Sequence, residues 1–314
     1  MSLPKNEYVS DVWKDGLFEK KVVFCTGGSG SICSAQVRAL VHLGANACIV
    51  GRQVEKTERV AKDIATARKG AKVLGIGSVD VRSVESLQKA VEKCISELGR
   101  IDFVIAGAAG NFLAPINQLS TNAFKSVMDI DVLGSYNTLK ATLPHLVKSA
   151  GNHRNDGKTA NPAGTGGRII FISATIHYTT MPFQTHVSVA KAGVDALSHS
   201  AAVEFGPRGV TSNIIAPGPI SGTEGMERLA TKEDNAKAHK SVPLGRYGTV
   251  KEIADATVYL FSDAGNFVNG QALVVDGAAW RTHSSNPGSS FPYPDFLLND
   301  EVVTGVKGGK NSKL

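Results

Sequence analysis

Short apolar segments alternate with longer amphipathic segments along most of this chain, and this alternation constrains the fold more than any other feature. An apolar run at residues 21–26 precedes a Gly/Ser-rich turn and a helical pattern that continues to Leu43. Apolar strands separated by amphipathic helices form a parallel sheet that is covered on both faces. The sequence therefore predicts an α/β fold: a single doubly wound (Rossmann-type) parallel sheet with helices on both faces. We expect further strands at 46–50, 72–78, 101–106, 167–173, 210–216 and 271–275, and helices at about 53–68, 83–98, 120–148, 184–205 and 249–262.

The alternation extends over residues 18–281, which we expect to form one domain. Residues 1–17 precede it as an N-terminal extension. Residues 150–167 are polar and rich in Gly, Asn and Pro, which predicts a surface loop insertion, long for this kind of connection. Beyond Trp280 the composition shifts to Ser, Pro and Gly, so we expect residues 282–314 to form a C-terminal tail.

Composition and charge exclude several classes of protein. Hydrophobic residues make up 42% of the chain and charged residues 20%, which is typical of an ordered globular protein. There is no apolar run long enough to cross a bilayer and no secretory signal, so we expect an intracellular protein without a membrane span. Four irregularly spaced cysteines match neither a metal site nor a disulfide framework. No basic run is interleaved with aromatic residues, so nucleic acid is not an expected partner.

The turn after the first expected strand reads Thr26-Gly27-Gly28-Ser29-Gly30-Ser31-Ile32-Cys33. Glycines between a strand and a helix let the turn tighten and let backbone N–H groups at the helix N-terminus approach a pyrophosphate. The segment resembles the cofactor loop Thr-Gly-x-x-x-Gly-Ile-Gly of the short-chain dehydrogenase/reductase family, with Ser31 and Cys33 in place of two glycines. We expect residues 26–32 to bind a dinucleotide, and the alternative is a degenerate loop that binds nothing.

The residues after the second expected strand bear on the choice between NAD and NADP. A dehydrogenase that uses NAD usually has an acidic residue here to bind the ribose 2′-hydroxyl. This chain instead reads Val50-Gly51-Arg52-Gln53, and an arginine can pair with the 2′-phosphate, so NADPH is the expected cofactor. Residues 52–72 are rich in basic side chains and fit either a solvated helix face or a site for phosphorylated ligands. Taken alone, Arg52 is more simply explained as a surface residue.

The family resemblance adds three further groups of cofactor contacts. Asp80 and Val81 match the position that contacts adenine, and Ala108 lies in the turn where the family has Asn-Asn-Ala-Gly. A later turn should cover the nicotinamide and reach the pyrophosphate. Its expected contacts are Pro217, Gly218, Pro219, Ile220 and Thr223.

Lys191 occupies the lysine position of the family motif Tyr-x-x-x-Lys, on the helix expected at 184–205. The tyrosine position holds Val187, so the usual proton donor of the family is absent. His186 and Tyr178 are candidate replacements. However, His186 projects about 100° away from Val187 on a helix, and each is more simply explained as a structural residue.

Three segments narrow the resemblance to the peroxisomal 2,4-dienoyl-CoA reductases within this family. They are residues 109–112, 122–131 and 217–225, and the resemblance as a whole covers about residues 18–281. It implies NADPH-dependent reduction of a 2,4-dienoyl-CoA to a 3-enoyl-CoA. Asp131 stands where most family members have a catalytic asparagine, and Ile176 stands where the mitochondrial relatives have a tyrosine.

On this resemblance the catalytic residues are Asp131, Lys191 and Asn111. Lys191 would hold the nicotinamide ribose, and Asn111 would stabilise negative charge on the thioester oxygen. Asp131 beside a lysine should remain ionised, which favours proton delivery by an ordered water relayed through it over direct donation by a carboxylic acid. The alternative for Asp131 is an ordinary aspartate at a helix end.

The resemblance also implies an acyl-CoA site and a homo-oligomer, either a dimer or a tetramer. Arginines suit the phosphates of CoA, and Phe112 suits the acyl or pantetheine portion. We expect the helices at 120–148 and 184–205 to pack against their copies, through apolar positions such as Val194 and Ala201. The expected substrate contacts are Arg52, Arg82, Phe112, Ser120, Thr121, Asn122 and Arg228.

The chain ends in Ser312-Lys313-Leu314, the tripeptide that the peroxisomal import receptor reads, which predicts the peroxisome matrix as its location. Two alternative functions are a peroxisomal 2-enoyl-CoA or 3-oxoacyl-CoA reductase, and a non-catalytic NADP-binding partner protein. The missing tyrosine weighs against ketone reduction. The presence of Lys191 and Asp131 weighs against a loss of catalysis.

Overall fold

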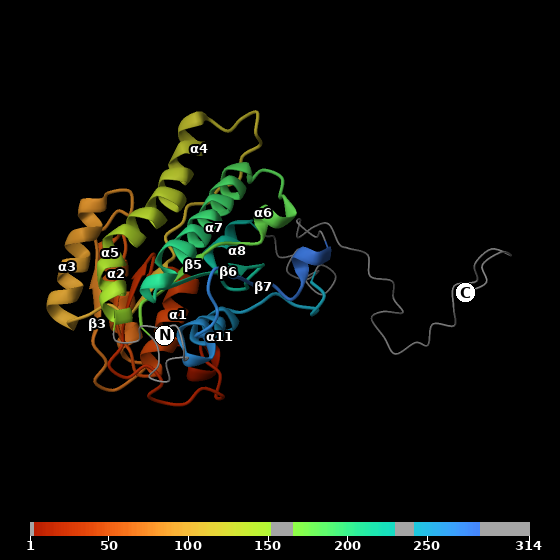
Figure 1. Cartoon of the computed structure of the whole chain (residues 1–314). Coiled ribbons are helices and arrows are strands. Elements are labelled where there is room, and N and C mark those ends of the chain that lie inside the picture. Colours follow the sequence, from red (N-terminus) through yellow and green to blue (C-terminus); the bar gives the residue numbers. More distant parts are fainter. Residues whose placement is uncertain (1–2, 152–165, 230–241, 283–314) are drawn as a thin grey trace, which may run out of the picture.

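A seven-stranded, entirely parallel sheet forms the centre of the molecule in a computed structural model that describes residues 3–151, 166–229 and 242–282 (Figure 1). The strand order β3-β2-β1-β4-β5-β6-β7 reverses direction between β1 and β4, as in a doubly wound fold. The predicted fold class is therefore confirmed. The strands are β1 (Val22–Thr26), β2 (Asn46–Val50), β3 (Val73–Ile76), β4 (Phe103–Ala106), β5 (Arg168–Ile172), β6 (Thr211–Pro217) and β7 (Ala272–Val275).

Helices cover both faces of the sheet (Figure 1). The long helices follow the expected ranges closely, whereas the two short helices α6 and α8 carry too little periodicity to be expected from the sequence. The helices are α1 (Ser31–His42), α2 (Val54–Ala65), α3 (Val84–Leu98), α4 (Thr121–Met128), α5 (Gly134–Ala150), α6 (Ile176–Thr179), α7 (Thr185–Phe205), α8 (Glu224–Leu229) and α11 (Val250–Phe261).

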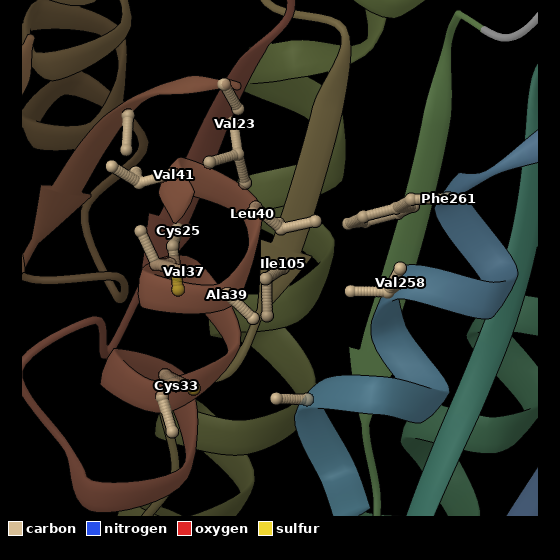
Figure 2. Close-up of a cluster of buried hydrophobic side chains, with 14 of the residues drawn as sticks. Val23, Cys25, Cys33, Val37, Ala39, Leu40, Val41, Ile105, Val258 and Phe261 are labelled. Atoms are coloured by element: carbon tan, nitrogen blue, oxygen red, sulfur yellow. The ribbon is translucent and has the colours of Figure 1, made fainter. Parts of the chain in front are cut away.

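Successive residues of β1 point to opposite faces and so contribute to two separate cores. Val23 and Cys25 pack against α1 and α11, where Leu40 and Phe261 are fully buried (Figure 2). Val22 and Phe24 face the second core, which includes side chains of α3, α5 and α7. Val194 and Ala201 on α7 belong to this second core, so their apolar character serves packing within the subunit.

The segment expected as one helix at about 120–148 consists of α4, a π-helical turn at Asp129–Leu133 and α5. A π-helical turn inserts an extra residue into the helical ladder and changes the direction in which its side chains point. Asp131 lies in this turn and is fully buried. The interruption of the helix thus accompanies the inward placement of the aspartate.

The described part of the N-terminal segment packs onto the domain. Tyr8 and Val9 are buried in the core that contains α1 and α11. The Asp255 carboxylate on α11 accepts hydrogen bonds from the Ser10 backbone N–H at 3.0 Å and from the Trp13 indole at 2.8 Å. Most of the expected loop at 150–167 and nearly all of the tail at 282–314 lie outside the described residues.

Two expected absences can be examined only in the described part of the chain. None of its helices is long and apolar enough to cross a membrane. Among the same residues, no group of three or more His, Cys, Asp or Glu side chains is arranged to hold a metal ion.

Candidate active site

A cavity of about 700 Å³ lies at the carboxyl ends of β1, β4, β5 and β6. Ligands of open α/β sheets bind in this position, where the strand order reverses. The loops after all four strands contribute to the walls, and α7 contributes Val187 and Lys191. The sheet topology thus brings the two expected halves of the site, for cofactor and for reaction, into one cavity.

The turn after β1 forms the cofactor end of this cavity. Gly27 has a φ of +66°, and a Cβ there would lie 2.7 Å from the Gly107 carbonyl oxygen, so only glycine fits without strain. Gly30, Ser31 and Ile32 line the cavity at the N-terminus of α1. A helix N-terminus with exposed N–H groups attracts phosphate. This cradle therefore suits the pyrophosphate of a dinucleotide.

Thr26 and Gly28 attach the turn to its neighbours in the sheet. The Thr26 hydroxyl accepts a hydrogen bond of 3.2 Å from the Gly107 backbone N–H, which ties β1 to the loop after β4. A Cβ on Gly28 would lie 2.6 Å from Cβ of Ile49, so this glycine permits close packing against β2. Both residues shape the turn instead of lining the cavity as it is described.

Cys33 stands where the family pattern has a glycine, and its side chain has a defined place. A Cβ on Gly107 would lie 2.3 Å from the Cys33 sulfur, so the thiol occupies the space that a side chain at position 107 would need. The absence of a side chain on one loop thus accommodates the extra side chain on the other.

The residues expected at the adenosine end gather at the ends of β2 and β3. Arg52 is exposed, and its positive charge contributes to a lowered pKa of Asp80. The larger cause is Arg82, whose guanidinium donates hydrogen bonds to both carboxylate oxygens of Asp80. Val81 is buried beneath them, and its carbonyl accepts a hydrogen bond of 2.9 Å from Asn137.

Lys191 and Asp131 meet at the reacting end. Lys191 Nζ lies 3.1 Å from Asp131 Oδ2 and donates a hydrogen bond of 3.0 Å to the carbonyl of Ile172 at the end of β5. Asp131 Oδ1 accepts a hydrogen bond of 2.7 Å from the Gly110 N–H. Oδ2 receives no directed hydrogen bond from the described residues, so the contact with Lys191 is an ion pair by distance alone. The carboxylate keeps an acceptor position on the side facing the lysine.

The position of the family tyrosine is apolar. Val187 is 2% exposed and lines the cavity. The Tyr178 hydroxyl donates a hydrogen bond of 2.6 Å to Asp195, and burial followed by this hydrogen bond raises the pKa of Tyr178. His186 is fully buried beneath Phe112, and burial lowers its pKa. These contacts fit the structural explanation of both candidate replacements.

The expected substrate residues do not all lie together. Asn111 and Phe112 line the cavity, whereas Arg82, Ser120, Thr121 and Asn122 are exposed and are not among its described lining residues. Ser120 caps α4 by accepting a hydrogen bond from the Ala123 N–H at 3.2 Å. Arg228 lies on α8, and its side chain is outside the description.

The turn after β6 forms the wall opposite the glycine-rich loop. Pro217, Gly218, Pro219, Ile220 and Thr223 all line the cavity. The Thr223 hydroxyl donates a hydrogen bond of 2.9 Å to the Ile220 carbonyl, which closes the turn before α8.

Several lining residues were not found by sequence reasoning, among them Gln184, Tyr247 and Trp280. They lie outside the motifs, and Trp280 belongs to a short 3-10 helix, so no spacing marks them. Trp280 packs against the Tyr178 ring, which connects the C-terminal wall of the cavity to α6.

Comparisons with known proteins identify relatives of this chain. A family model described as Enoyl-(Acyl carrier protein) reductase matches residues 27–278. The peroxisomal 2,4-dienoyl-CoA reductase [(3E)-enoyl-CoA-producing] of Saccharomyces cerevisiae is 51% identical over 91% of this chain and 92% of that protein. The protein of the same description from Danio rerio is 39% identical over 90% of this chain and 88% of its own.

Solved structures lead to the same family. A short chain dehydrogenase from Bacillus anthracis aligns with a TM-score of 0.70 and 34% identity, over 83% of this chain and 96% of that one. A short-chain type dehydrogenase/reductase from Mycobacterium ulcerans aligns with a TM-score of 0.75 and 27% identity, over 84% and 91%. With its doubly wound sheet, its glycine-rich turn and these relatives, the chain belongs to the short-chain dehydrogenase/reductase family.

Proposed function

We propose that this chain is an NADPH-dependent 2,4-dienoyl-CoA reductase that produces 3-enoyl-CoA in the peroxisomal β-oxidation of unsaturated fatty acids. The observation that carries the proposal is the Lys191–Asp131 ion pair beside a cavity in which Val187 replaces the family tyrosine. Relatives with 51% and 39% identity bear the name of this reductase.

The cofactor end fits a nicotinamide dinucleotide. The N-terminus of α1 and Lys191 line the cavity and would hold the pyrophosphate and the nicotinamide ribose. Asp80 and Val81 would contact the adenine. Arg52 pairs with a 2′-phosphate, which favours NADPH over NADH. When bound, this cofactor supplies the hydride.

Side chains of this protein stabilise the anion that forms on reduction and deliver the proton that completes it. Reduction of a 2,4-dienoyl thioester at its far end places negative charge on the thioester oxygen. Asn111 lies at the cavity wall and has one side-chain N–H for this oxygen, since the other is donated to Gln184. Lys191 adds a fixed positive charge near that anion. Asp131, held by Gly110 and Lys191, positions a water that delivers the proton to carbon, which gives the 3-enoyl product.

The same geometry disfavours the 3-oxoacyl-CoA alternative. Reduction of a ketone needs an acid at the carbonyl oxygen, and the side chain in the tyrosine position is that of Val187. The Tyr178 hydroxyl already donates a hydrogen bond to Asp195, and His186 Nε2 donates one to the Phe112 carbonyl. Reduction of a dienoyl thioester instead needs stabilisation of the dienolate anion and delivery of a proton to carbon.

One assay tests the proposal directly. The purified chain is given NADPH with 2,4-hexadienoyl-CoA, crotonyl-CoA or acetoacetyl-CoA, and the loss of NADPH absorbance is followed. We expect turnover with the dienoyl thioester far above that with the other two. A preference for crotonyl-CoA or acetoacetyl-CoA would replace the proposal by one of the alternative reductases, and binding of NADPH without any turnover would support the non-catalytic partner.

Two further features accompany the function. Ser312-Lys313-Leu314 directs the protein to the peroxisome matrix through the import receptor. The subunit forms a homo-oligomer, for which the exposed apolar side chains Tyr136 on α5 and Val189 and Val203 on α7 offer contact positions. Light scattering that gives the mass of one chain would reject the oligomer.

A further inference from the structure

We propose that His186 is a positioning residue of the proposed reduction, which fixes the cavity wall formed by Asn111 and Phe112. The inference rests on the proposed function, because it concerns how that site holds the dienoyl thioester. His186 does not reach the reacting atoms and acts only through its neighbours.

His186 holds Phe112 in two ways. Its Nε2 lies 3.0 Å from the Phe112 carbonyl oxygen, and its ring stacks on the Phe112 ring with centroids 4.2 Å apart and planes inclined by 19°. His186 is fully buried, whereas Phe112 is 37% exposed and lines the cavity. The histidine therefore forms a rigid support behind the aromatic side chain that faces the ligand.

The hydrogen bond places a proton on Nε2, and the burial of Nδ1 favours the neutral ring. A carbonyl oxygen only accepts, so Nε2 carries the proton and donates it. Nδ1 is buried and has no hydrogen-bond partner among the described residues, and burial lowers the pKa of His186. A neutral ring with its one N–H already donated is suited to support and unsuited to acid catalysis.

The neighbours of His186 hold the same wall. The Asn111 side-chain amide donates a hydrogen bond of 3.1 Å to Gln184, which is also fully buried. The Ala114 N–H donates a hydrogen bond of 2.9 Å to the carbonyl of Phe183. The start of α7 and the residues just before it therefore clamp the loop after β4 at three successive points.

The clamp is connected to the catalytic pair through one peptide segment. Gly110 precedes Asn111 and donates its N–H to Asp131 Oδ1 at 2.7 Å. A displaced Phe112 carbonyl would move Asn111 and Gly110 with it, and so change both the oxyanion donor and the hydrogen bond that orients Asp131. Small displacements of positioning groups have large effects on turnover. The pyrophosphate end of the cofactor site, on the loop after β1, is not part of this connection, so NADPH binding should change less than turnover.

Two substitutions separate the two contacts. His186→Gln keeps a side-chain N–H donor and removes the ring, whereas His186→Phe keeps a stacking ring and removes the donor. If the hydrogen bond fixes the loop, kcat/KM for 2,4-hexadienoyl-CoA should fall about tenfold in His186→Phe, the scale of one lost hydrogen bond, and less than that in His186→Gln. The Kd for NADPH, measured by fluorescence titration, should change less than about twofold in both.

Gln184→Ala removes the hydrogen bond between Asn111 and Gln184. It should likewise lower kcat/KM for 2,4-hexadienoyl-CoA and leave the Kd for NADPH nearly unchanged. His199→Ala is the matched control, because His199 lies on the same helix and is exposed. If the role of His186 is only to stabilise the fold, its variants will lower the melting temperature and the fraction of active enzyme while the kcat/KM per folded molecule stays that of the wild type.

That result, or an equal weakening of NADPH binding, overturns the inference. If His186→Phe does not fold, the inference is tested by comparing Gln184→Ala with the wild type, again through kcat/KM for the dienoyl thioester and the Kd for NADPH. Failure of the proposed function is distinguishable, because the unaltered chain would then show no preference for the dienoyl thioester.

Discussion

The sulfur of Cys33 and the missing side chain of Gly107 share one space at the floor of the cofactor site. A Cβ on Gly107 would lie 2.3 Å from this sulfur and 3.2 Å from the Thr26 carbonyl oxygen. Cys33 is 4% exposed and belongs to the first turn of α1, whose N-terminus lines the cavity. The segments that follow β1 and β4 are therefore complementary in shape, and a larger side chain in one should displace the other.

Gly107→Ala should weaken NADPH binding by about tenfold, because the new methyl group pushes the first turn of α1 away from its position under the pyrophosphate. Cys33→Ala removes the sulfur, so the double variant Gly107→Ala with Cys33→Ala should recover most of the affinity. Fluorescence titration with NADPH of the wild type, the two single variants and the double variant gives the coupling free energy between the two positions. Additive effects would show that the two residues do not compete for this space.

Arg52→Asp should reverse the preference for NADPH over NADH, because it replaces a cation that pairs with the 2′-phosphate by an anion that repels it. We expect the ratio of the two kcat/KM values to change by about a hundredfold or more. Arg59→Asp is the control, because it makes the same change of charge at another exposed arginine, on α2. An unchanged ratio in Arg52→Asp would assign the selection to another residue.

Asp131→Ala should lower kcat by a factor of roughly 10² to 10⁴, the usual scale for losing a general acid or base, with little change in the KM for NADPH. Lys191→Ala should impair both kcat and that KM, because it removes a cofactor contact together with the charge near the anion. Steady-state kinetics with NADPH and 2,4-hexadienoyl-CoA measure both values.

Asp131→Asn is the informative control, because it keeps an acceptor for the Gly110 N–H without the negative charge beside Lys191. A decrease below about threefold in Asp131→Ala would move proton delivery to another group. Removing one partner of a buried ion pair also destabilises the fold, so kcat is calculated per folded molecule.

Tyr178→Phe should leave turnover nearly unchanged and lower the stability at neutral pH by about 1.5 to 3 kcal/mol, the range for a hydrogen bond to a charged group. Burial raises the pKa of Asp195, but the hydrogen bonds with His177 and Tyr178, together with the nearby Ser173 hydroxyl, outweigh it, and the net pKa is lowered. A carboxylate with a lowered pKa stabilises the fold above its unfolded-state pKa, and this stabilisation disappears as the pH falls through the folded-state pKa. The difference between variant and wild type should therefore shrink in acid.

Denaturant unfolding at neutral and at acidic pH measures this difference. A loss of turnover in Tyr178→Phe, with the fold intact, would instead make Tyr178 the proton donor.

Deletion of Ser312 to Leu314 should leave the activity of the purified enzyme intact and move the protein to the cytosol, because the tripeptide is read by a receptor. Cell fractionation or a fluorescent fusion that leaves the C-terminus free reports the location. The experiment is done in cells without the full-length chain, which would otherwise carry the shortened copy along in an oligomer. Continued import in those cells would reveal a second signal.

The sequence by itself determined the sheet and marked candidate residues for the cofactor end of the site. The seven strands lie within two residues of their expected ends, because each is a short apolar run bounded by turn residues and by an amphipathic helix. The glycine-rich turn was recognisable because its chemistry depends on residues adjacent in the chain, and the role of Arg52 stays a prediction. Lys191 and Asp131 were found by resemblance to a family, since neither the apolar periodicity nor the charge pattern marks them.

Only the tertiary structure decided how the reacting end is assembled. The π-helical turn that buries Asp131, the stack of His186 on Phe112 and the space shared by Cys33 and Gly107 each join segments that are distant in sequence. Tyr8 and Val9 likewise become core residues only because α1 and α11 lie beside them. A local sequence pattern determines the secondary structure that a segment prefers. The contacts named above depend instead on which segments become neighbours when the helices pack on the sheet.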